Sequence, residues 1–306
     1  MVFYFKTFLY HTMFKKFSAL KRHIPLLCFL LVFTISSIAV FAQTNKETLS
    51  NPFYNYKGKL IIIGGGSIPD SLFSFFANYI GGKDQPVVYI PTATTDEEFI
   101  QKGEHLIKFT SRGYTNLSTI HTRNKKEADN PKNLELMRNA KGLYFGGGDQ
   151  QLIADAYAGT KLYDEFIALL NRGGVIMGTS AGATIMGSLM IGGDARDDIS
   201  KKYAFNDAFS FMTNTALDQH VLARNRQFDL ISVIENYPGT LGIGLDESTA
   251  IIVEAGQFKV WGKSYAMLYD PMDWAAQKKK WGKVLKPFKM MASGSSFNFV
   301  TREIIK

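Results

Sequence analysis

Apolar runs of strand length alternate with segments of helical periodicity along most of this 306-residue chain, and this alternation limits its fold more than any other feature. The order strand, helix, strand favours an α/β fold with a doubly wound, mostly parallel sheet. In such a sheet, ligands bind beyond the carboxyl ends of the strands. The expected strands are 59–63, 87–90, 117–120, 142–145, 175–177, 242–245 and 250–253, and the expected helices are 69–79, 97–110, 133–139, 150–158, 162–170 and 226–234. Antiparallel additions are expected near the C-terminus, at 257–261, 265–269 and 297–304.

The first 42 residues differ in composition from the rest. They hold five basic side chains and no acid, and an apolar run extends from Ile24 to Ala42. This pattern is typical of a secretory signal peptide, and the small residues Val40 and Ala42 predict cleavage before Gln43. A retained membrane anchor is the alternative, because the run is nearly long enough to span a bilayer, although Pro25 weakens it. We therefore expect a protein that is secreted or periplasmic, without stable membrane insertion after the leader is removed.

Removal of the leader lowers the formal net charge from +8 to +3. The basic excess is thus mostly a targeting signal, which argues against a nucleic-acid partner, and the lysines at 278–280 are interpreted as a solvated helix face. The single cysteine, Cys28, lies within the leader, so residues 43–306 hold no disulfide and no thiol nucleophile. We expect a flexible lead-in at 43–57 and one domain at 58–306.

Four loops rich in glycine or small polar residues follow expected strands, at 64–67, 91–94, 146–150 and 178–182, and could face one crevice. A nucleotide site is not expected, because Pro69 stands where a third fingerprint glycine is needed and neither glycine loop leads into a Lys-Ser or Lys-Thr pair. No metal is expected either, since the acids of the 194–198 segment lack regular calcium-ligand spacing. Those acids are Asp194, Asp197 and Asp198.

The segment Gly178–Gly182 predicts a nucleophilic serine. It follows the apolar run 175–177 and precedes a helix start, and its flanking glycines allow a sharp turn that exposes the Ser180 hydroxyl. An ordinary strand-to-helix turn is the alternative. The amide of Ala181 and that of Gly148, in a neighbouring glycine turn, are the expected donors of an oxyanion hole.

A serine nucleophile needs a base, and residues 43–306 offer three histidines. His105 lies in an expected helix as a surface or packing residue, and His121 has no polar motif around it. His220 stands in the polar segment 217–226 and is the best base, with a capping segment as the alternative.

Two carboxylates, Asp246 and Glu247, directly follow the expected strand 242–245. One of them is expected to orient the imidazole of His220, although both could simply begin a turn. The chain order serine, histidine, acid is acceptable, because triads are recognised by geometry.

Four motifs in one order, at 147–150, 178–183, 218–226 and 242–247, make the chain resemble the cyanophycinases and related secreted serine peptidases. These share a flavodoxin-like, class I glutamine amidotransferase-like fold with the aspartyl dipeptidases, and the resemblance spans most of residues 58–270. It implies Ser180 as nucleophile, His220 as base and Glu247 as the orienting acid. The implied substrate-binding residues are Gln150, Asp218, Gln219, Arg224 and Arg226.

This implied pocket suits a zwitterionic or aspartate-bearing peptide. Paired arginines can bind a carboxylate bidentately, and Asp218 can hold a guanidinium or amine. Two departures, Asp229 in place of a usual arginine and Val221 in place of a usual aromatic residue, are interpreted as lying on the substrate side. They leave serine peptidase chemistry better supported than cleavage of cyanophycin itself.

The expected function is therefore that of a secreted serine-type exopeptidase that hydrolyses aspartyl peptide or isopeptide bonds and releases β-Asp-Arg. It needs no cofactor, and its partner is a peptide substrate or a cyanophycin-like polymer. Alternatives are an α-aspartyl dipeptidase with the same triad and a noncatalytic peptide-binding protein. Members of the family often dimerise, and the sequence leaves a homodimer open.

Overall fold

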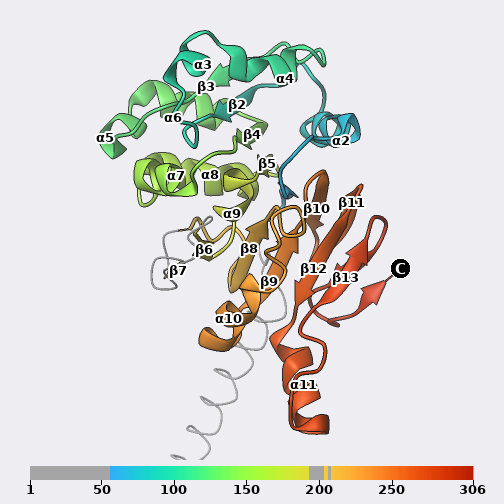
Figure 1. The fold of residues 1–306 in the computed structure, drawn as a ribbon. Helices are drawn as coiled ribbons and strands as arrows, with labels where there is room; N and C mark the ends of the chain where they lie inside the picture. The colour runs from blue at the N-terminus through green and yellow to red at the C-terminus, as the bar shows by residue number, and fades with distance from the viewer. Residues whose placement is uncertain (1–55, 193–202, 206–207, 306) are drawn as a thin grey trace, which may run out of the picture. The chain divides into compact units, whose positions relative to one another are not determined.

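The computed structural model describes residues 56–192, 203–205 and 208–305 (Figure 1). They belong to one compact unit, Thr48–Lys306. The expected signal peptide, most of the expected lead-in, and Asp194, Asp197 and Asp198 lie outside the described residues. No helix in the described ranges is long and apolar enough to cross a membrane.

Five parallel strands form one half of the larger sheet and end at its edge strand, β3 (Leu117–Thr119). Residues of the four inner strands are almost all buried, as parallel strands covered on both faces must be. In spatial order the strands are β1 (Lys59–Ile63), β5 (Val175–Thr179), β4 (Gly142–Phe145), β2 (Val87–Ile90) and β3.

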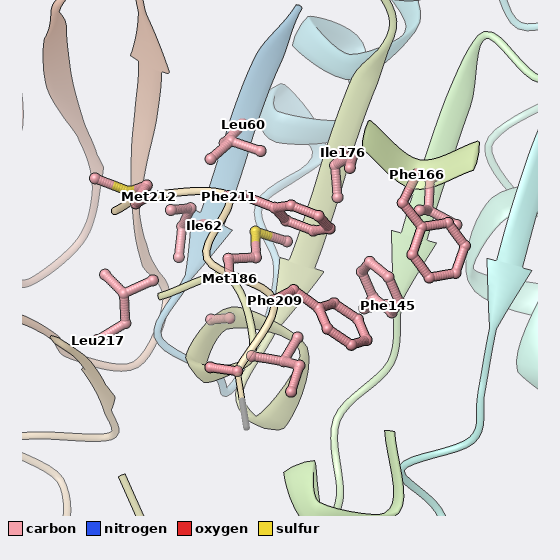
Figure 2. Packing of buried hydrophobic residues seen from close by; sticks show 14 of the residues in the cluster. Leu60, Ile62, Phe145, Phe166, Ile176, Met186, Phe209, Phe211, Met212 and Leu217 are labelled. Carbon is pink, nitrogen blue, oxygen red and sulfur yellow. The ribbon is translucent and has the colours of Figure 1, made fainter. Parts of the chain in front are cut away.

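Helices cover both faces of these strands (Figure 1). On one face, α2 (Asp70–Ile80) and α4 (Ile107–Thr110) pack with the aromatic rings of Tyr89 and Tyr144. The other face is covered by α6 (Pro131–Asn139), α7 (Gln150–Tyr157), α8 (Lys161–Asn171) and α9 (Ala181–Thr184), with short α5 (Lys125–Ala128) alongside. Figure 2 shows the core on this face, where the rings of Phe145 and Phe166 meet edge to face at 5.4 Å. The α/β expectation is confirmed.

The single helix expected at 97–110 is wrong. The segment forms α3 (Glu97–Gln101), a 3-10 turn η1 (Glu104–Leu106) and α4. Gly103 interrupts it in the left-handed region, with φ of 72°. His105 is buried on η1, where its ring meets Tyr89.

Antiparallel strands extend the larger sheet beyond β1. They are β10 (Thr249–Glu254), β11 (Gln257–Gly262), β14 (Ser296–Asn298) and β15 (Ile304–Ile305), which complete nine strands among the described residues. The expected C-terminal additions are thus present, although residues 265–269 join a different sheet.

A second sheet of six strands was not predicted. Its order is β13 (Lys289–Ala292), β12 (Tyr265–Tyr269), β9 (Leu241–Leu245), β8 (Thr215–Gln219), β6 (Leu189–Ile191) and β7 (Tyr203–Phe205), and its helices are α10 (Asp229–Asn236) and α11 (Pro271–Trp281). The strand β8 was not predicted because its last two residues, Asp218 and Gln219, are polar. The helix expected from Arg226 begins only at Asp229, because the preceding residues form a turn. The finer flavodoxin-like, doubly wound arrangement stays a prediction.

Candidate active site

Strand ends from both sheets converge at the site. In the larger sheet β1 and β5 are parallel, with Ile63 opposite Thr179, so the loop after β1 emerges beside Ser180. In the second sheet β8 and β9 are parallel, with Gln219 opposite Leu245. Parallel strands leave a sheet at the same edge, so His220 and the acidic pair emerge together.

Ser180 lies in a strained turn between β5 and α9. Its φ of 54° and ψ of −116° are rare for a residue with a side chain, and such a conformation costs about 1–3 kcal/mol. A backbone hydrogen bond of 3.0 Å from its amide to the Ile63 carbonyl holds the turn. Gly182 allows close packing, since a Cβ there would lie 2.4 Å from the Phe145 carbonyl oxygen. The predicted strand, sharp turn and helix start are therefore present.

Ser180, His220 and Glu247 form a continuous hydrogen-bonded chain. The Ser180 Oγ lies 2.9 Å from His220 Nε2, and His220 Nδ1 lies 2.6 Å from Glu247 Oε1. Of the two candidate acids, Glu247 contacts the imidazole, whereas Asp246 accepts hydrogen bonds from the backbone amides of Leu222 and Ala223. This arrangement suits transfer of a hydroxyl proton to the imidazole.

The environment of His220 favours its neutral form. Burial lowers its pKa below the ordinary value, and the positive charges of Arg224 and Arg226 act in the same direction. The hydrogen bond and charge of Glu247 oppose this effect without reversing it. A neutral imidazole can accept a proton, so this histidine is available as a base at neutral pH.

The glycine turn Gly64–Gly66 packs against the histidine and the acid. A Cβ on Gly65 would lie 2.2 Å from the Cε1 of His220, and a Cβ on Gly66 would lie 2.9 Å from the Oε2 of Glu247. The His220 amide also donates to the Gly64 carbonyl at 2.9 Å. The sequence predicts that this loop could face the same crevice as Ser180, but its contacts with His220 and Glu247 were not predicted.

A pocket of about 390 Å³ opens beside Ser180. Arg224 supplies an exposed cation and Arg226 a buried one. Gln150 is held by a 2.6 Å hydrogen bond from its Nε2 to the Ile191 carbonyl, and the Oε1 of Gln219 lies 3.4 Å from the Ser180 Oγ. The complete lining is Gly148, Asp149, Gln150, Ser180, Gln219, Arg224 and Arg226.

The glycine turn before α7 is fixed from behind by the loop after β2. A Cβ on Gly148 would lie 2.1 Å from the Ala93 carbonyl oxygen, and the Asp149 amide donates to that oxygen at 2.8 Å. The 91–94 loop therefore supports the pocket wall and is not part of the lining named above, contrary to the expectation that all four loops face the crevice.

Three residues expected on the substrate side, Asp218, Val221 and Asp229, are not among the lining residues of this pocket in the described part of the chain. Asp218 is buried, with its Oδ1 3.8 Å from Arg226 Nη1. Val221 is fully buried against Gly244, where a Cβ would lie 2.9 Å from its Cγ1. Asp229 begins α10. The two departures from the cyanophycinase pattern, Val221 and Asp229, are therefore not themselves lining residues of this pocket.

The other two histidines with described positions serve other contacts. His105 Nε2 lies 2.7 Å from Thr119 Oγ1. His121 Nδ1 lies 3.1 Å from Thr92 Oγ1, and its Nε2 lies 3.0 Å from a Glu97 carboxylate oxygen. This second hydroxyl, histidine and carboxylate series cannot reach a substrate, because Thr92 is fully buried.

Comparisons with known proteins found a matching peptidase family, similar cyanophycinases and a solved structure with a similar fold. The model of peptidase family S51 matches residues 60–261. A cyanophycinase of Geminocystis herdmanii is 27% identical over 222 residues, covering 70% of this chain and 81% of that protein. A cyanophycinase of Trichormus variabilis is 28% identical over 226 residues, covering 71% and 75%. The crystal structure of a peptidase from an acI-B1 actinobacterium has a similar fold, with a TM-score of 0.63 at 22% identity, over 80% of this chain and 98% of that one.

Proposed function

The chain belongs to peptidase family S51, and we propose that it is a secreted serine-type exopeptidase that hydrolyses peptide or isopeptide bonds of aspartate. The observation that carries this proposal is the hydrogen-bonded series Ser180, His220 and Glu247 at the edge of a pocket with two arginines. Such a series activates a hydroxyl that is otherwise a weak nucleophile.

In the proposed reaction, the Ser180 Oγ attacks the scissile carbonyl carbon while His220 Nε2 takes its proton. The amides of Ala181 and Gly148 donate to the resulting oxyanion; neither has a backbone acceptor among the described residues. His220 then gives the proton to the leaving amine, and an acyl ester remains on Ser180. A water molecule hydrolyses that ester by the same steps in reverse order.

The pocket supports a substrate with a carboxylate near the scissile bond. Arg224 and Arg226 can bind a carboxylate, while Gln150 and Gln219 offer amide groups for orientation. A volume of about 390 Å³ accommodates a short terminal group of a peptide, as the proposed exopeptidase action requires. Release of β-Asp-Arg is the specific activity we propose, because relatives named cyanophycinases cover most of this chain.

The test is hydrolysis by the purified exported protein of β-Asp-Arg polymer, α-aspartyl dipeptides and matched dipeptides without aspartate. Release of β-Asp-Arg, absent with Ser180→Ala, is the expected result. Cleavage of α-aspartyl dipeptides alone would instead support the dipeptidase. Failure on every aspartyl substrate, with retained binding of one, would support a peptide-binding protein.

Export through the leader is part of the proposal. Amino-terminal sequencing of the exported protein is expected to begin near Gln43, and a retained hydrophobic run would contradict export by a cleaved leader.

The pH dependence of kcat/KM is expected to report the neutral His220. The imidazole must be unprotonated to act as base, and its pKa is lowered. We therefore expect the fall of kcat/KM on the acid side, the acid limb, to have its midpoint below the ordinary pKa of histidine. Neutralising Arg224 in Arg224→Gln removes a charge that lowers this pKa, so the limb should move to higher pH. Arg224→Lys keeps the charge and should leave the limb in place. A limb that moves equally in both variants would contradict this account.

Substituting Gly65 by alanine is expected to lower kcat about 100-fold, because the new Cβ would overlap the His220 ring and displacing a catalytic group by about 1 Å costs that much. Gly103→Ala is the matched control. Gly103 also has a positive φ, but its added Cβ would meet nothing within 4 Å, so activity should persist despite about 1–2 kcal/mol of backbone strain. Equal kcat losses in the two variants, measured at matched folded fraction, would refute the steric explanation.

A further inference from the structure

Asp246 is a buried carboxylate whose two oxygens accept three hydrogen bonds. Oδ1 accepts from the amides of Leu222 at 3.1 Å and Ala223 at 3.0 Å. Oδ2 accepts from the Ser264 hydroxyl at 2.6 Å, and the residue is 8% exposed. Removing such a carboxylate would leave buried donors unsatisfied, which costs more than an ordinary hydrogen bond contributes.

The two amides that Asp246 binds belong to a turn formed by residues 221–226, which we call the arginine turn. Backbone hydrogen bonds from Arg224 to the His220 carbonyl and from Arg226 to the Val221 carbonyl close it. Both of these arginines line the pocket. The backbone before Arg224 is therefore tied to the end of β9 and, through Ser264, to the connection between β11 and β12.

Neighbouring acids thus contact different parts of the site. Glu247 binds the imidazole of His220, and Asp246 binds the backbone of the arginine turn. We infer that Asp246 is a positioning residue that holds Arg224 and Arg226 at the pocket and thereby sets the affinity for the anionic group of the substrate. The inference rests on the proposed function in one respect, namely that these arginines bind substrate.

Asp246 remains ionised in this position. Burial opposes its ionisation, but the hydrogen bonds from the Ser264 hydroxyl and from the Ala223 and Leu222 amides outweigh burial, so the pKa of Asp246 is lowered. A charged acceptor makes stronger hydrogen bonds than a neutral one. The arginine turn is accordingly held by charge-assisted bonds at neutral pH.

The test compares Asp246→Ala, Asp246→Asn and Ser264→Ala in the full exported protein. In Asp246→Ala we expect KM to rise roughly tenfold, as the loss of buried hydrogen bonds predicts, with kcat within about threefold of the original value. Hydrogen exchange of the Leu222 and Ala223 amides should accelerate. Asparagine can accept from both amides and donate to the Ser264 oxygen, so Asp246→Asn should restore most of the affinity. Ser264→Ala should give a smaller KM rise.

Asp270→Ala is the matched control for a merely structural effect. Asp270 is also buried, and it caps α11 by accepting from the Met272 amide at 2.9 Å. This variant should lose stability without changing KM. Unchanged exchange at 222–223 in both Asp246→Ala and Ser264→Ala would overturn the inference, as would an equal KM rise in Asp270→Ala. If the unmodified protein hydrolyses no aspartyl substrate, the proposed function fails. Accelerated hydrogen exchange of the Leu222 and Ala223 amides in Asp246→Ala would still support the inference that Asp246 positions the arginine turn.

Discussion

Replacing Ser180 by alanine is expected to lower kcat for the aspartyl substrate by about 10⁶-fold, the order of loss seen when a serine nucleophile is removed. The substitution removes the Oγ that lies 2.9 Å from His220 Nε2 and keeps the Cβ. Because alanine has the same Cβ and no further side-chain atom, it adds no new steric contact in this turn. Substrate affinity should therefore change little, because the pocket arginines remain in place. Single-turnover hydrolysis and equilibrium binding of the same substrate measure the two effects separately.

Ser74→Ala is the control for this prediction. The Ser74 hydroxyl donates to the Asp70 carbonyl on the exposed side of α2, so its removal should leave kcat unchanged. A Ser180→Ala protein with undiminished hydrolysis would exclude Ser180 as the nucleophile. Loss of substrate binding together with loss of hydrolysis would instead indicate that the substitution had changed the structure of the turn between β5 and α9.

Strands that consist almost wholly of apolar residues could be predicted to their ends. β1, which has only Lys59 as a polar residue, and β2 and β4 match the expected bounds, because parallel strands buried on both faces need continuous apolar residues. β8 was missed for the opposite reason: Asp218 and Gln219 are buried on a strand, and an ion pair and the pocket accommodate their polarity. Buried polar groups of this kind are typical of a functional site, and a strand that carries them cannot be predicted from a run of apolar residues.

The serine could be predicted from local glycine spacing, whereas its surroundings depend on contacts between distant segments. No local pattern says that Gly65 will meet the ring of His220, or that Val221 will turn inward against Gly244. The acidic pair shows this dependence on the path of the chain most clearly. Asp246 and Glu247 are adjacent, and only the path of the chain after β9 decides which of them reaches the imidazole.

Glu247→Gln tests that assignment and is expected to lower kcat by about 10⁴-fold, as the equivalent change does in other serine triads. The Glu247 carboxylate accepts from His220 Nδ1 at 2.6 Å, which leaves Nε2 unprotonated toward Ser180. A glutamine amide can donate to Nδ1 and so stabilise the tautomer whose Nε2 cannot accept a proton. Stopped-flow measurement of acylation would show the loss directly.

The pH profile separates this effect from general damage. Glu247 raises the pKa of His220 against the larger effect of burial. Its neutralisation should therefore move the acid limb of the residual activity to lower pH, opposite to the shift expected for Arg224→Gln. Glu254→Gln removes an acid that pairs with Lys59 on the neighbouring strand β1 and should change neither kcat nor the limb. If Asp246→Asn rather than Glu247→Gln abolished acylation, the two acids would have to exchange roles.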